Sequence, residues 1–319
     1  MPTRRSFLQS TAAMAAAMAG ASAIKAQARS RASGGILTEP ASARPTAPVQ
    51  VPRMKFFDTE ISRMVLGVNP FCGYAHYNNN FSGAMKDWYT PERVCAVMHD
   101  AARYGINAFN YVALERLPQD WLRFVAEGGK MHLIMQVLSD DDDTAKLAKT
   151  LKPLAMFRQG EVTDIAYRNG TMNTVREWCK KVRDMGVIVG VGTHKSEVIA
   201  QVEDEGWDVD FYAGCVYNRT RTREEWKKAL NGEIMEMENE IYVQSDPPRM
   251  YSVMRQTTKP CFAFKVLAAG RIADGGIEQA FRTAFSSIKP NDGIFVGMFP
   301  RAKDEVRENA EIVHRILQG

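Results

Sequence analysis

The sequence predicts an α/β fold, a (β/α)8 barrel in one domain that spans residues 54–319. Short apolar segments alternate with amphipathic segments eight times along this range, which is the pattern of repeated βα units. Apolar segments such as 187–191 have no polar face, as expected of parallel strands that are covered on both sides. About 265 residues is also a usual size for such a barrel. A doubly wound open sheet is the alternative, but no GxGxxG follows the first strand.

The expected elements follow one another in a regular order. Segments 54–57 and 60–63 flank Asp58-Thr59 and predict a hairpin ahead of the barrel. The strands are expected at 64–68, 106–112, 131–138, 162–167, 187–192, 209–216, 261–267 and 293–296. The helices are expected at 91–104, 118–127, 142–157, 172–185, 195–205, 246–257, 277–288 and 302–317. Gly or Pro marks most boundaries, as where Pro91 opens the first helix and Gly105 ends it.

One long segment, 220–244, lies outside this regular alternation. It follows the sixth strand, and its amphipathic part around Trp226 and Leu230 predicts an additional helix. An insert at this end of a barrel is interpreted either as a cover over the mouth or as a static surface helix.

The formal net charge of +4 is concentrated near the N-terminus. Residues 1–28 contain Arg4, Arg5 and Lys25 and no acidic residue, whereas residues 54–319 hold 34 basic and 36 acidic side chains. A barrel domain without a dense basic face is not expected to bind nucleic acid.

The first 28 residues have the pattern of a twin-arginine signal peptide. Arg4-Arg5 precedes a weakly apolar, Ala-rich stretch and the small-x-small sequence Ala26-Gln27-Ala28. We predict export by the twin-arginine machinery, cleavage near Ala28, and a periplasmic or extracellular location. Residues 29–53 are rich in Ala, Ser and Pro and predict a flexible linker. No apolar stretch reaches the ~20 residues of a membrane-spanning helix, so no stable membrane anchor is expected.

Neither the cysteines nor the histidines predict a set of metal ligands. The five cysteines are scattered and form no CxxC pair, which excludes zinc-ribbon and iron–sulfur sites of the usual spacing. The sequence therefore assigns no metal-binding residue and leaves the presence of a metal open. The oligomeric state is also open.

Polar residues at the C-terminal ends of the expected strands are the candidates for the functional site, because barrel enzymes place their sites there. His194 and Lys265 are candidate acid–base groups, and Glu115 and Asn110 complete the candidate catalytic set. The candidate substrate-binding residues are Asn69, His76, Tyr77, Tyr111, Gln136, Arg168, Asn169, Tyr217 and Asn218. Aromatic rings and amides in the loop after the first strand, residues 70–89, suit a hydroxylated ligand. The alternative is that those rings pack on the rim of the barrel.

Several segments together resemble the aldo/keto reductase superfamily. They are Val65-Leu66-Gly67 after the hairpin, Tyr104 to Asn110, Gly190-Val191-Gly192-Thr193-His194, Lys265 to Gly270, and Val296-Gly297-Met298 followed by Glu305 to Asn309. The resemblance implies a barrel and an NADP(H) cofactor. It implies that Thr193 and His194 lie near the nicotinamide, and that Arg301, Lys303 and Asn309 lie near the 2′-phosphate.

The catalytic residues of that superfamily are not present at the matching positions. The family uses an Asp, a Tyr, a Lys and a His, where this sequence has Asn110, Glu115, Gln136 and Asn169. Because Glu115 replaces the family's Tyr, no phenol is present at that position to protonate a carbonyl oxygen. His194 or Glu115 would therefore have to donate the proton.

Three hypotheses follow for the function. The first is an exported, NADP(H)-linked oxidoreductase that acts on a small polar or carbohydrate-like substrate. The second is a non-redox isomerase, lyase or glycoside-processing enzyme that uses Glu115, His194 and Lys265. The third is a catalytically inactive barrel that binds a ligand or a partner.

Overall fold

The computed structural model describes residues 46–139, 141–233, 240–272 and 274–318. The predicted signal peptide and residues 29–45 of the predicted linker lie outside the described residues. Eight parallel strands close into a barrel in the order β10-β3-β4-β5-β6-β7-β8-β9, which confirms the predicted fold class. These strands are β3 (Met64–Gly67), β4 (Ala108–Tyr111), β5 (His132–Val137), β6 (Ala155–Arg158), β7 (Ile188–Thr193), β8 (Phe211–Cys215), β9 (Cys261–Phe264) and β10 (Gly293–Gly297).

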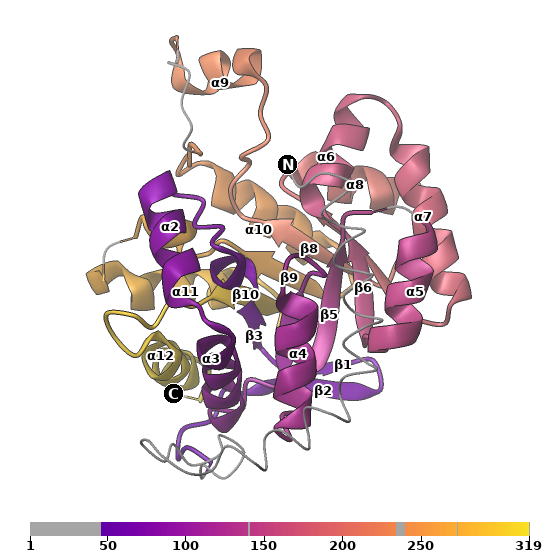
Figure 1. Cartoon of the computed structure of the whole chain (residues 1–319). Coiled ribbons are helices and arrows are strands. Elements are labelled where there is room, and N and C mark those ends of the chain that lie inside the picture. Colours follow the sequence, from indigo (N-terminus) through magenta and orange to yellow (C-terminus); the bar gives the residue numbers. More distant parts are fainter. Residues whose placement is uncertain (1–45, 140, 234–239, 273, 319) are drawn as a thin grey trace, which may run out of the picture.

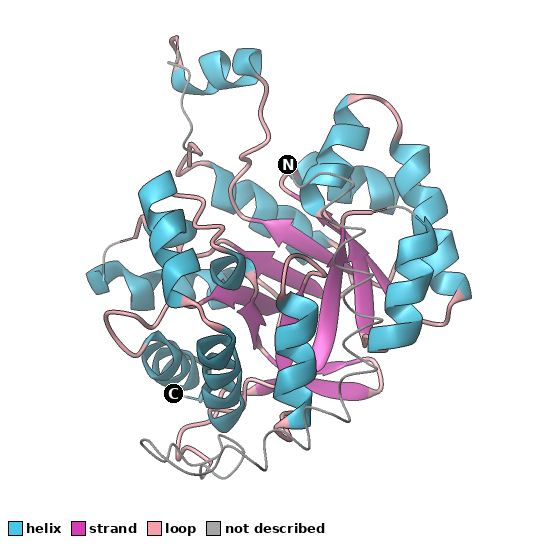
Figure 2. Ribbon diagram, viewed as in Figure 1, coloured by secondary structure: helices cyan, strands magenta, loops and turns pink. Residues whose placement is uncertain are grey.

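Helices surround the barrel, as Figure 2 shows. They are α3 (Pro91–Arg103), α4 (Leu117–Ala126), α5 (Asp141–Leu151), α6 (Gly160–Arg168), α7 (Met172–Asp184), α8 (Ser196–Asp204), α10 (Asp246–Gln256), α11 (Ile277–Ser287) and α12 (Glu305–Gln318). Further helices are α2 (Asn79–Trp88) in the loop after β3, α9 (Arg223–Leu230) in the insert after β8, and the 3-10 turns η2 (Asn69–Cys72), η3 (Ala268–Gly270) and η4 (Asp274–Gly276). Within the described residues, no helix is long and apolar enough to cross a membrane.

The predicted hairpin closes the N-terminal end of the barrel. Strands β1 (Arg53–Phe56) and β2 (Thr59–Ser62) pair antiparallel and lie at the bottom of Figure 1, opposite α9. Phe56 inserts between Phe211 and Phe262, with ring centroids 5.6 and 5.5 Å away. This interior cluster is separate from the larger apolar layer between the strands and the helices. A ligand must therefore enter from the opposite, C-terminal end.

The fourth strand is not where the sequence predicted it. The strand is Ala155–Arg158, and the predicted strand 162–167 lies within helix α6. Helix α5 ends at Leu151 because Pro153 disfavours a helical conformation at the preceding residue. Gln159 caps α6, since its side chain accepts a hydrogen bond from the backbone N–H of Val162 at 3.0 Å. Only three residues separate this strand from α5, so residues 155–157 fall at the end of the helix that the sequence predicts over 142–157.

Residues 47–53, which the sequence assigns to the linker, contact the barrel domain. Ala47 and Val51 are buried, and their backbone N–H groups donate to the carbonyls of Arg103 and Tyr104 at 3.1 and 2.8 Å. The side chain of Gln50 donates to the carbonyl of Arg103 at 2.8 Å. Ordered packing thus begins several residues before the hairpin.

The packing of the hairpin residue Phe56 at the N-terminal end of the barrel gives a test of the fold. Phe56 is 0% exposed and its neighbour Phe57 is 39% exposed. We expect Phe56→Ala to lower the free energy of unfolding by about 3–5 kcal/mol, because it leaves a cavity among the aromatic rings. Phe57→Ala is the matched control and should change it by less than about 0.5 kcal/mol. Urea unfolding measures both, and equal losses would contradict the assigned role of Phe56.

Candidate functional site

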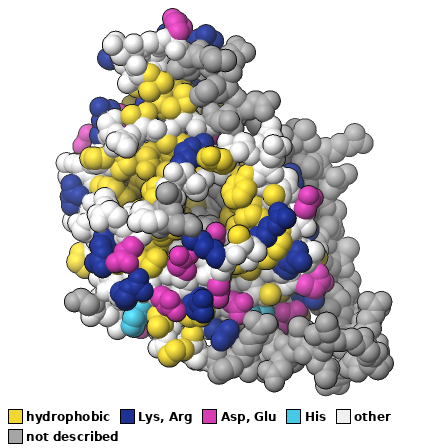
Figure 3. Space-filling model, turned by 90° about the vertical axis from the view of Figure 1, so that its left-hand side faces the viewer, with side chains coloured by type: hydrophobic (Ala, Val, Ile, Leu, Met, Phe, Trp, Pro, Cys, Tyr) yellow, Lys and Arg dark blue, Asp and Glu magenta, His cyan; other side chains and the backbone are white. Residues whose placement is uncertain are grey.

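A cavity of 2210 Å³ opens at the C-terminal end of the barrel and continues to the start of α12. Figure 3 shows a hollowed area with hydrophobic, Lys and Arg side chains around it. Ten of the predicted site residues line this cavity: Asn69, His76, Tyr77, Asn110, Glu115, Gln136, His194, Lys265, Lys303 and Asn309. The structure thus brings together side chains from the ends of β3, β4, β5, β7 and β9, as the barrel topology predicted.

Seven other predicted residues are not among those that line the large cavity. They are Thr193, Tyr111, Arg168, Asn169, Tyr217, Asn218 and Arg301. Asn218 lines a small neighbouring cavity together with His194. Arg168 and Asn169 end helix α6 and are exposed, which follows from the misplaced fourth strand.

Side-chain alternation explains the positions of Thr193 and Tyr111. Successive side chains of a strand point to opposite faces, so Asn110 points into the barrel and Tyr111 points toward the helices. Tyr111 packs against Trp121 of α4, with ring centroids 6.4 Å apart. Thr193 is likewise on the helix side and is 0% exposed. Gln136 shares the interior with Asn110, and its amide donates to the Asn110 Oδ1 at 3.4 Å.

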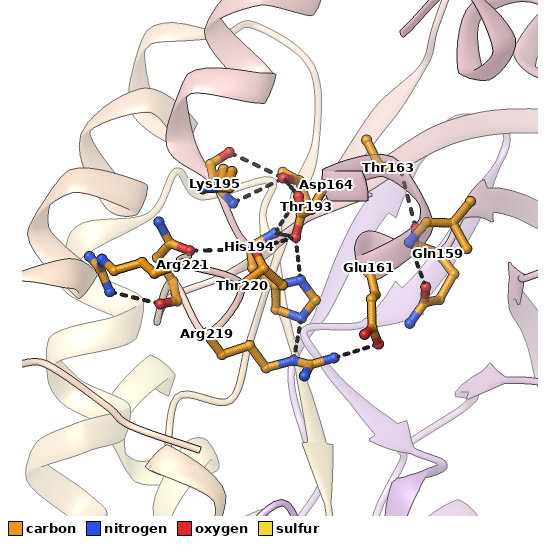
Figure 4. A network of polar contacts seen from close by, with 12 residues as sticks. Gln159, Glu161, Thr163, Asp164, Thr193, His194, Lys195, Arg219, Thr220 and Arg221 are labelled. Carbon is orange, nitrogen blue, oxygen red and sulfur yellow. Dashed lines mark hydrogen bonds and ion pairs between the residues drawn. The ribbon is translucent and has the colours of Figure 1, made fainter. Parts of the chain in front are cut away.

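His194 is held by Asp164, a buried residue of helix α6 (Figure 4). The Asp164 Oδ2 lies 2.7 Å from the His194 Nδ1 and accepts from the His194 backbone N–H at 3.1 Å. Thr193 and Thr220 donate their hydroxyls to the same carboxylate at 2.5 and 3.0 Å. Gly160 leaves room for the ring, because a Cβ there would lie 3.0 Å from the His194 Cε1.

The second ring nitrogen of His194 accepts a hydrogen bond. Arg219 donates its Nε–H to the His194 Nε2 at 3.1 Å, and a guanidinium can only donate. The Nδ1 therefore carries the proton and donates a hydrogen bond to Asp164, and the imidazole is neutral. Burial lowers the pKa of His194, although Asp164 opposes this shift. Burial would raise the pKa of Asp164, but the hydrogen bonds from His194 and Thr193 outweigh it and the pKa lies below its usual range.

A second ionic cluster centres on Glu240, which lies in the insert 220–244, between α9 and α10. Its Oε1 lies 2.7 Å from the His76 Nδ1 and 2.9 Å from an Arg219 guanidinium nitrogen. Its Oε2 lies 3.0 Å from the Lys265 Nζ and accepts the Tyr242 hydroxyl at 2.7 Å. Burial would raise the pKa of Glu240, but the hydrogen bond from His76 and the charges of Lys265 and Arg219 hold it well below its usual range.

Lys265 reaches the cavity through an unusual backbone conformation. It follows Phe264, which packs into the barrel interior, so alternation alone would direct Lys265 toward the helices. Its φ of 61° lies in the left-handed region, which a non-glycine residue adopts at a cost of about 1–3 kcal/mol. The side chain is 7% exposed and lines the cavity. Burial lowers the pKa of Lys265, and the charge of Glu240 opposes this.

Arg219 and Arg271 connect the loops around the mouth. Arg219 bridges His194, Glu240 and Glu161, the last at 3.0 Å. Arg271 donates to the backbone carbonyls of His76 and Glu240 at 2.8 and 2.9 Å. Charged side chains therefore join the segments that follow five strands, β3, β6, β7, β8 and β9.

The sequence predictions missed Asp164 and Glu240 and did not assign a role to Arg219. Asp164 was placed in a strand; recognition of helix α6 would have placed it one turn from the helix start, where it can face β7. Glu240 lies in the insert after the amphipathic helix α9, and no sequence pattern indicates that it contacts His76, Arg219 and Lys265. Its position depends on the path of the chain over the barrel mouth.

The residues assigned to NADP(H) are only partly brought together. Lys303 and Asn309 line the far end of the cavity, next to α12. Glu305 and Glu308 line the same end, and Glu308 lies 2.7 Å from the Lys303 Nζ. Acidic side chains outnumber basic ones there, which suits ribose hydroxyls better than a 2′-phosphate. Arg301 is exposed and lies outside the lining.

Comparisons with known proteins find the barrel but no sequence family. No protein-family model and no curated protein matches the chain. A truncated 3-deoxy-D-arabino-heptulosonate 7-phosphate synthase from Thermotoga maritima is 13% identical over 84% of this chain and 92% of its own, with a TM-score of 0.49. The glycerol dehydrogenase AKR11B4 from Gluconobacter oxydans, an aldo/keto reductase, is 13% identical over 84% and 96%, with a TM-score of 0.44. A mandelate oxidase with bound benzoyl-formic acid is 15% identical over 86% and 78%, with a TM-score of 0.48.

These three proteins are all enzymes, but they perform different reactions. At these identities and TM-scores, none of their activities is transferred to this chain. The chain is a barrel protein with distant similarity to enzymes of varied function.

The neutral state of His76 predicts a pH dependence of stability. Burial is the largest cause that lowers the pKa of His76 to about 4, and the charge of Lys265 adds to it. In the unfolded chain the pKa is about 6.5, so acidification between these values protonates the unfolded state first. The stability contributed by neutral His76 is present above about pH 6.5 and is lost as the pH falls to about 4, with a total of roughly 3 kcal/mol.

Urea unfolding at a series of pH values tests this expectation. The free energy of unfolding of the wild type should fall more steeply between about pH 6.5 and 4 than that of His76→Asn, which has no titrating ring. Parallel curves for the two proteins would show that the protonation of His76 is not linked to folding.

Proposed function

We propose that this chain is an enzyme that transfers a proton to or from a small polar substrate at the mouth of the barrel. Lys265 is the proton-transferring group in this proposal. The observation that carries it is the position of the Lys265 amine, which is almost fully buried yet lines the large cavity. A buried lysine with a lowered pKa is cationic beside a carboxylate but gives up its proton more readily than an exposed one.

The other polar residues of the mouth suit supporting roles. His194 has no free ring position in this arrangement, because one nitrogen donates to Asp164 and the other accepts from Arg219. It therefore orients Arg219 rather than acting as the base. The amides of Asn110 and Gln136 provide donors and acceptors at the bottom of the cavity, where they suit the hydroxyl or carbonyl groups of a substrate.

Glu115 is a weaker candidate for acid–base chemistry. It lines the cavity but is exposed, with a φ of 51°. An exposed carboxylate keeps its solvation, whereas the surroundings of Lys265 are built from buried ionic contacts. This difference favours Lys265 among the three acid–base residues that the non-redox hypothesis names.

A second candidate function is the NADP(H)-linked, aldo/keto reductase-like activity that the sequence resemblance implies. The observation that favours it is the length of the cavity, which runs from Lys265 to Lys303 and Asn309 beside α12. Those last two residues would hold the nucleotide end of the cofactor, which supplies a hydride when it is bound. The acidic lining at this end favours NADH over NADPH.

Proton exchange with solvent tests the role of Lys265. A panel of small hydroxy-ketones and hydroxy-acids is incubated with the protein in D2O, and the loss of the C–H signal beside the carbonyl is followed by proton NMR. We expect exchange by the wild type, and a reduction of about 10²- to 10⁴-fold in Lys265→Met, because the positioned base is removed. The rate should rise with pH as the Lys265 amine loses its proton.

Lys303→Met is the matched control for this experiment. Lys303 lines the same cavity at its other end and lies 2.7 Å from Glu308. It should retain exchange close to that of the wild type. Exchange by Lys265→Met at the wild-type rate, in a variant with an unchanged circular dichroism spectrum, would exclude Lys265 as the base.

Fluorescence titration with NADH and NADPH tests the second candidate. If the chain binds a nicotinamide dinucleotide, NADH should bind at least as tightly as NADPH, because Glu305 and Glu308 repel a 2′-phosphate. No binding of either cofactor at millimolar concentration would eliminate the redox function and leave the proton-transfer proposal intact.

A further inference from the structure

We propose that the groups around the Glu240 carboxylate form a binding site for a small carboxylate ligand, and that Glu240 occupies this site while the ligand is absent. The inference rests on the proposed function, because it names the substrate class of the same barrel mouth. In the absence of a substrate, the Glu240 carboxylate occupies the place that the carboxylate of a bound substrate would take.

The contacts of Glu240 are those of a complete carboxylate receptor. Each of its two oxygens has two donors, which together fill the four lone-pair positions of a carboxylate. His76 and Arg219 contact one oxygen, and Lys265 and Tyr242 contact the other, all between 2.7 and 3.0 Å. The donors come from loops that are far apart in the sequence, so their convergence on one point is a product of the fold.

Three of the four donors belong to the barrel itself. His76 follows β3, Arg219 follows β8, and Lys265 follows β9, at the end of the barrel where substrates bind. All three line the large cavity, so a ligand in the cavity can reach them. Glu240, in contrast, comes from the part of the insert that follows α9, and the barrel does not require it for closure.

The charges around Glu240 require an anion at this place. Lys265 and Arg219 are cationic and largely buried, with side chains 7% and 15% exposed. Arg219 also contacts a second carboxylate, that of Glu161, at 3.0 Å. Lys265, in contrast, contacts the carboxylate of Glu240. Removal of one partner from a buried ion pair is strongly destabilising. Glu240 can therefore leave only in exchange for another anion.

The same charge balance favours a carboxylate over a phosphate. Glu161 contacts Arg219 and Asp164 contacts His194, so a ligand with more than one negative charge is repelled by these two carboxylates. Two oxygens also match the four donors, whereas a phosphate would bring oxygens that these donors do not reach. His76, held neutral, donates one hydrogen bond and adds no charge.

Ligand binding to a variant without the Glu240 carboxylate tests the inference. Thermal unfolding of the wild type and of Glu240→Ala is followed as acetate, propionate or inorganic phosphate is added, with chloride to keep the ionic strength constant. We expect acetate and propionate to stabilise Glu240→Ala saturably, with an apparent affinity at least about tenfold higher than for the wild type. Phosphate should stabilise it less.

Two further variants show whether the ligand takes the place of Glu240. Lys265→Met in the Glu240→Ala background should abolish the carboxylate effect, because the main cation is gone. Glu161→Ala is the matched control, since it removes the other carboxylate beside Arg219 but leaves the receptor occupied by Glu240. It should bind acetate no better than the wild type. Glu240→Gln, which keeps the side-chain volume, replaces Glu240→Ala if the latter does not fold.

The outcomes separate this inference from the proposed function. No saturable effect of acetate or propionate beyond that of chloride in either Glu240 variant, or tighter binding of phosphate, would overturn the carboxylate site. The assay reads stability and not turnover, so this result would leave proton transfer by Lys265 untouched. Carboxylate binding together with unchanged deuterium exchange in Lys265→Met would instead support the ligand class and exclude the proposed base.

Discussion

The alternation of side chains along the strands of the closed barrel is the constraint on which the rest of this structure depends. Eight parallel strands form a cylinder without edges, and each residue on a strand must face either the interior or the helices. Interior positions near the N-terminal end are apolar and pack on the hairpin. Interior positions near the other end include Asn110 and Gln136, so polarity increases along the barrel axis toward the open mouth.

The same alternation separates neighbours in the sequence. Thr193 and His194 are adjacent, yet the hydroxyl of Thr193 lies on the helix side and the ring of His194 lines the cavity. The carboxylate of Asp164, in helix α6, accepts a hydrogen bond from the Thr193 hydroxyl and another from the His194 ring. Lys265 departs from the alternation through its left-handed backbone. The candidate base thus occupies a position that a regular strand would have turned away from the cavity.

Buried charges organise the mouth beyond what the barrel requires. Two carboxylates, Asp164 and Glu240, each accept several hydrogen bonds, and Arg219 connects the two groups through His194. Because an unpaired buried charge is costly, the loops that carry these residues stabilise one another. A site of this kind is preorganised, and ligand binding then exchanges one set of ionic contacts for another instead of creating them.

Local sequence patterns predict the barrel, the hairpin, seven of the eight strand positions and the end of the barrel at which the large cavity opens. Each of these follows from local patterns, namely apolar runs, helix caps and the spacing of Gly and Pro. The sequence also singled out His194, Lys265 and His76 as residues of the mouth. The fourth strand was missed because only three residues separate it from α5, so its residues were assigned to the end of that helix. Arg168 and Asn169 were misplaced with it.

The polar contacts at the barrel mouth, in contrast, follow from the way that separate loops and helices meet there. Glu240 contacts Lys265, His76 and Arg219, which are between 21 and 164 residues away along the chain, and nothing local in the sequence relates them. The protonation of His194 also depends on Asp164, which lies in helix α6, and on Arg219, which lies in the loop after β8. Periodicity reports which face of an element is buried, whereas a polar site depends on which charged groups meet when separate elements close around a common centre.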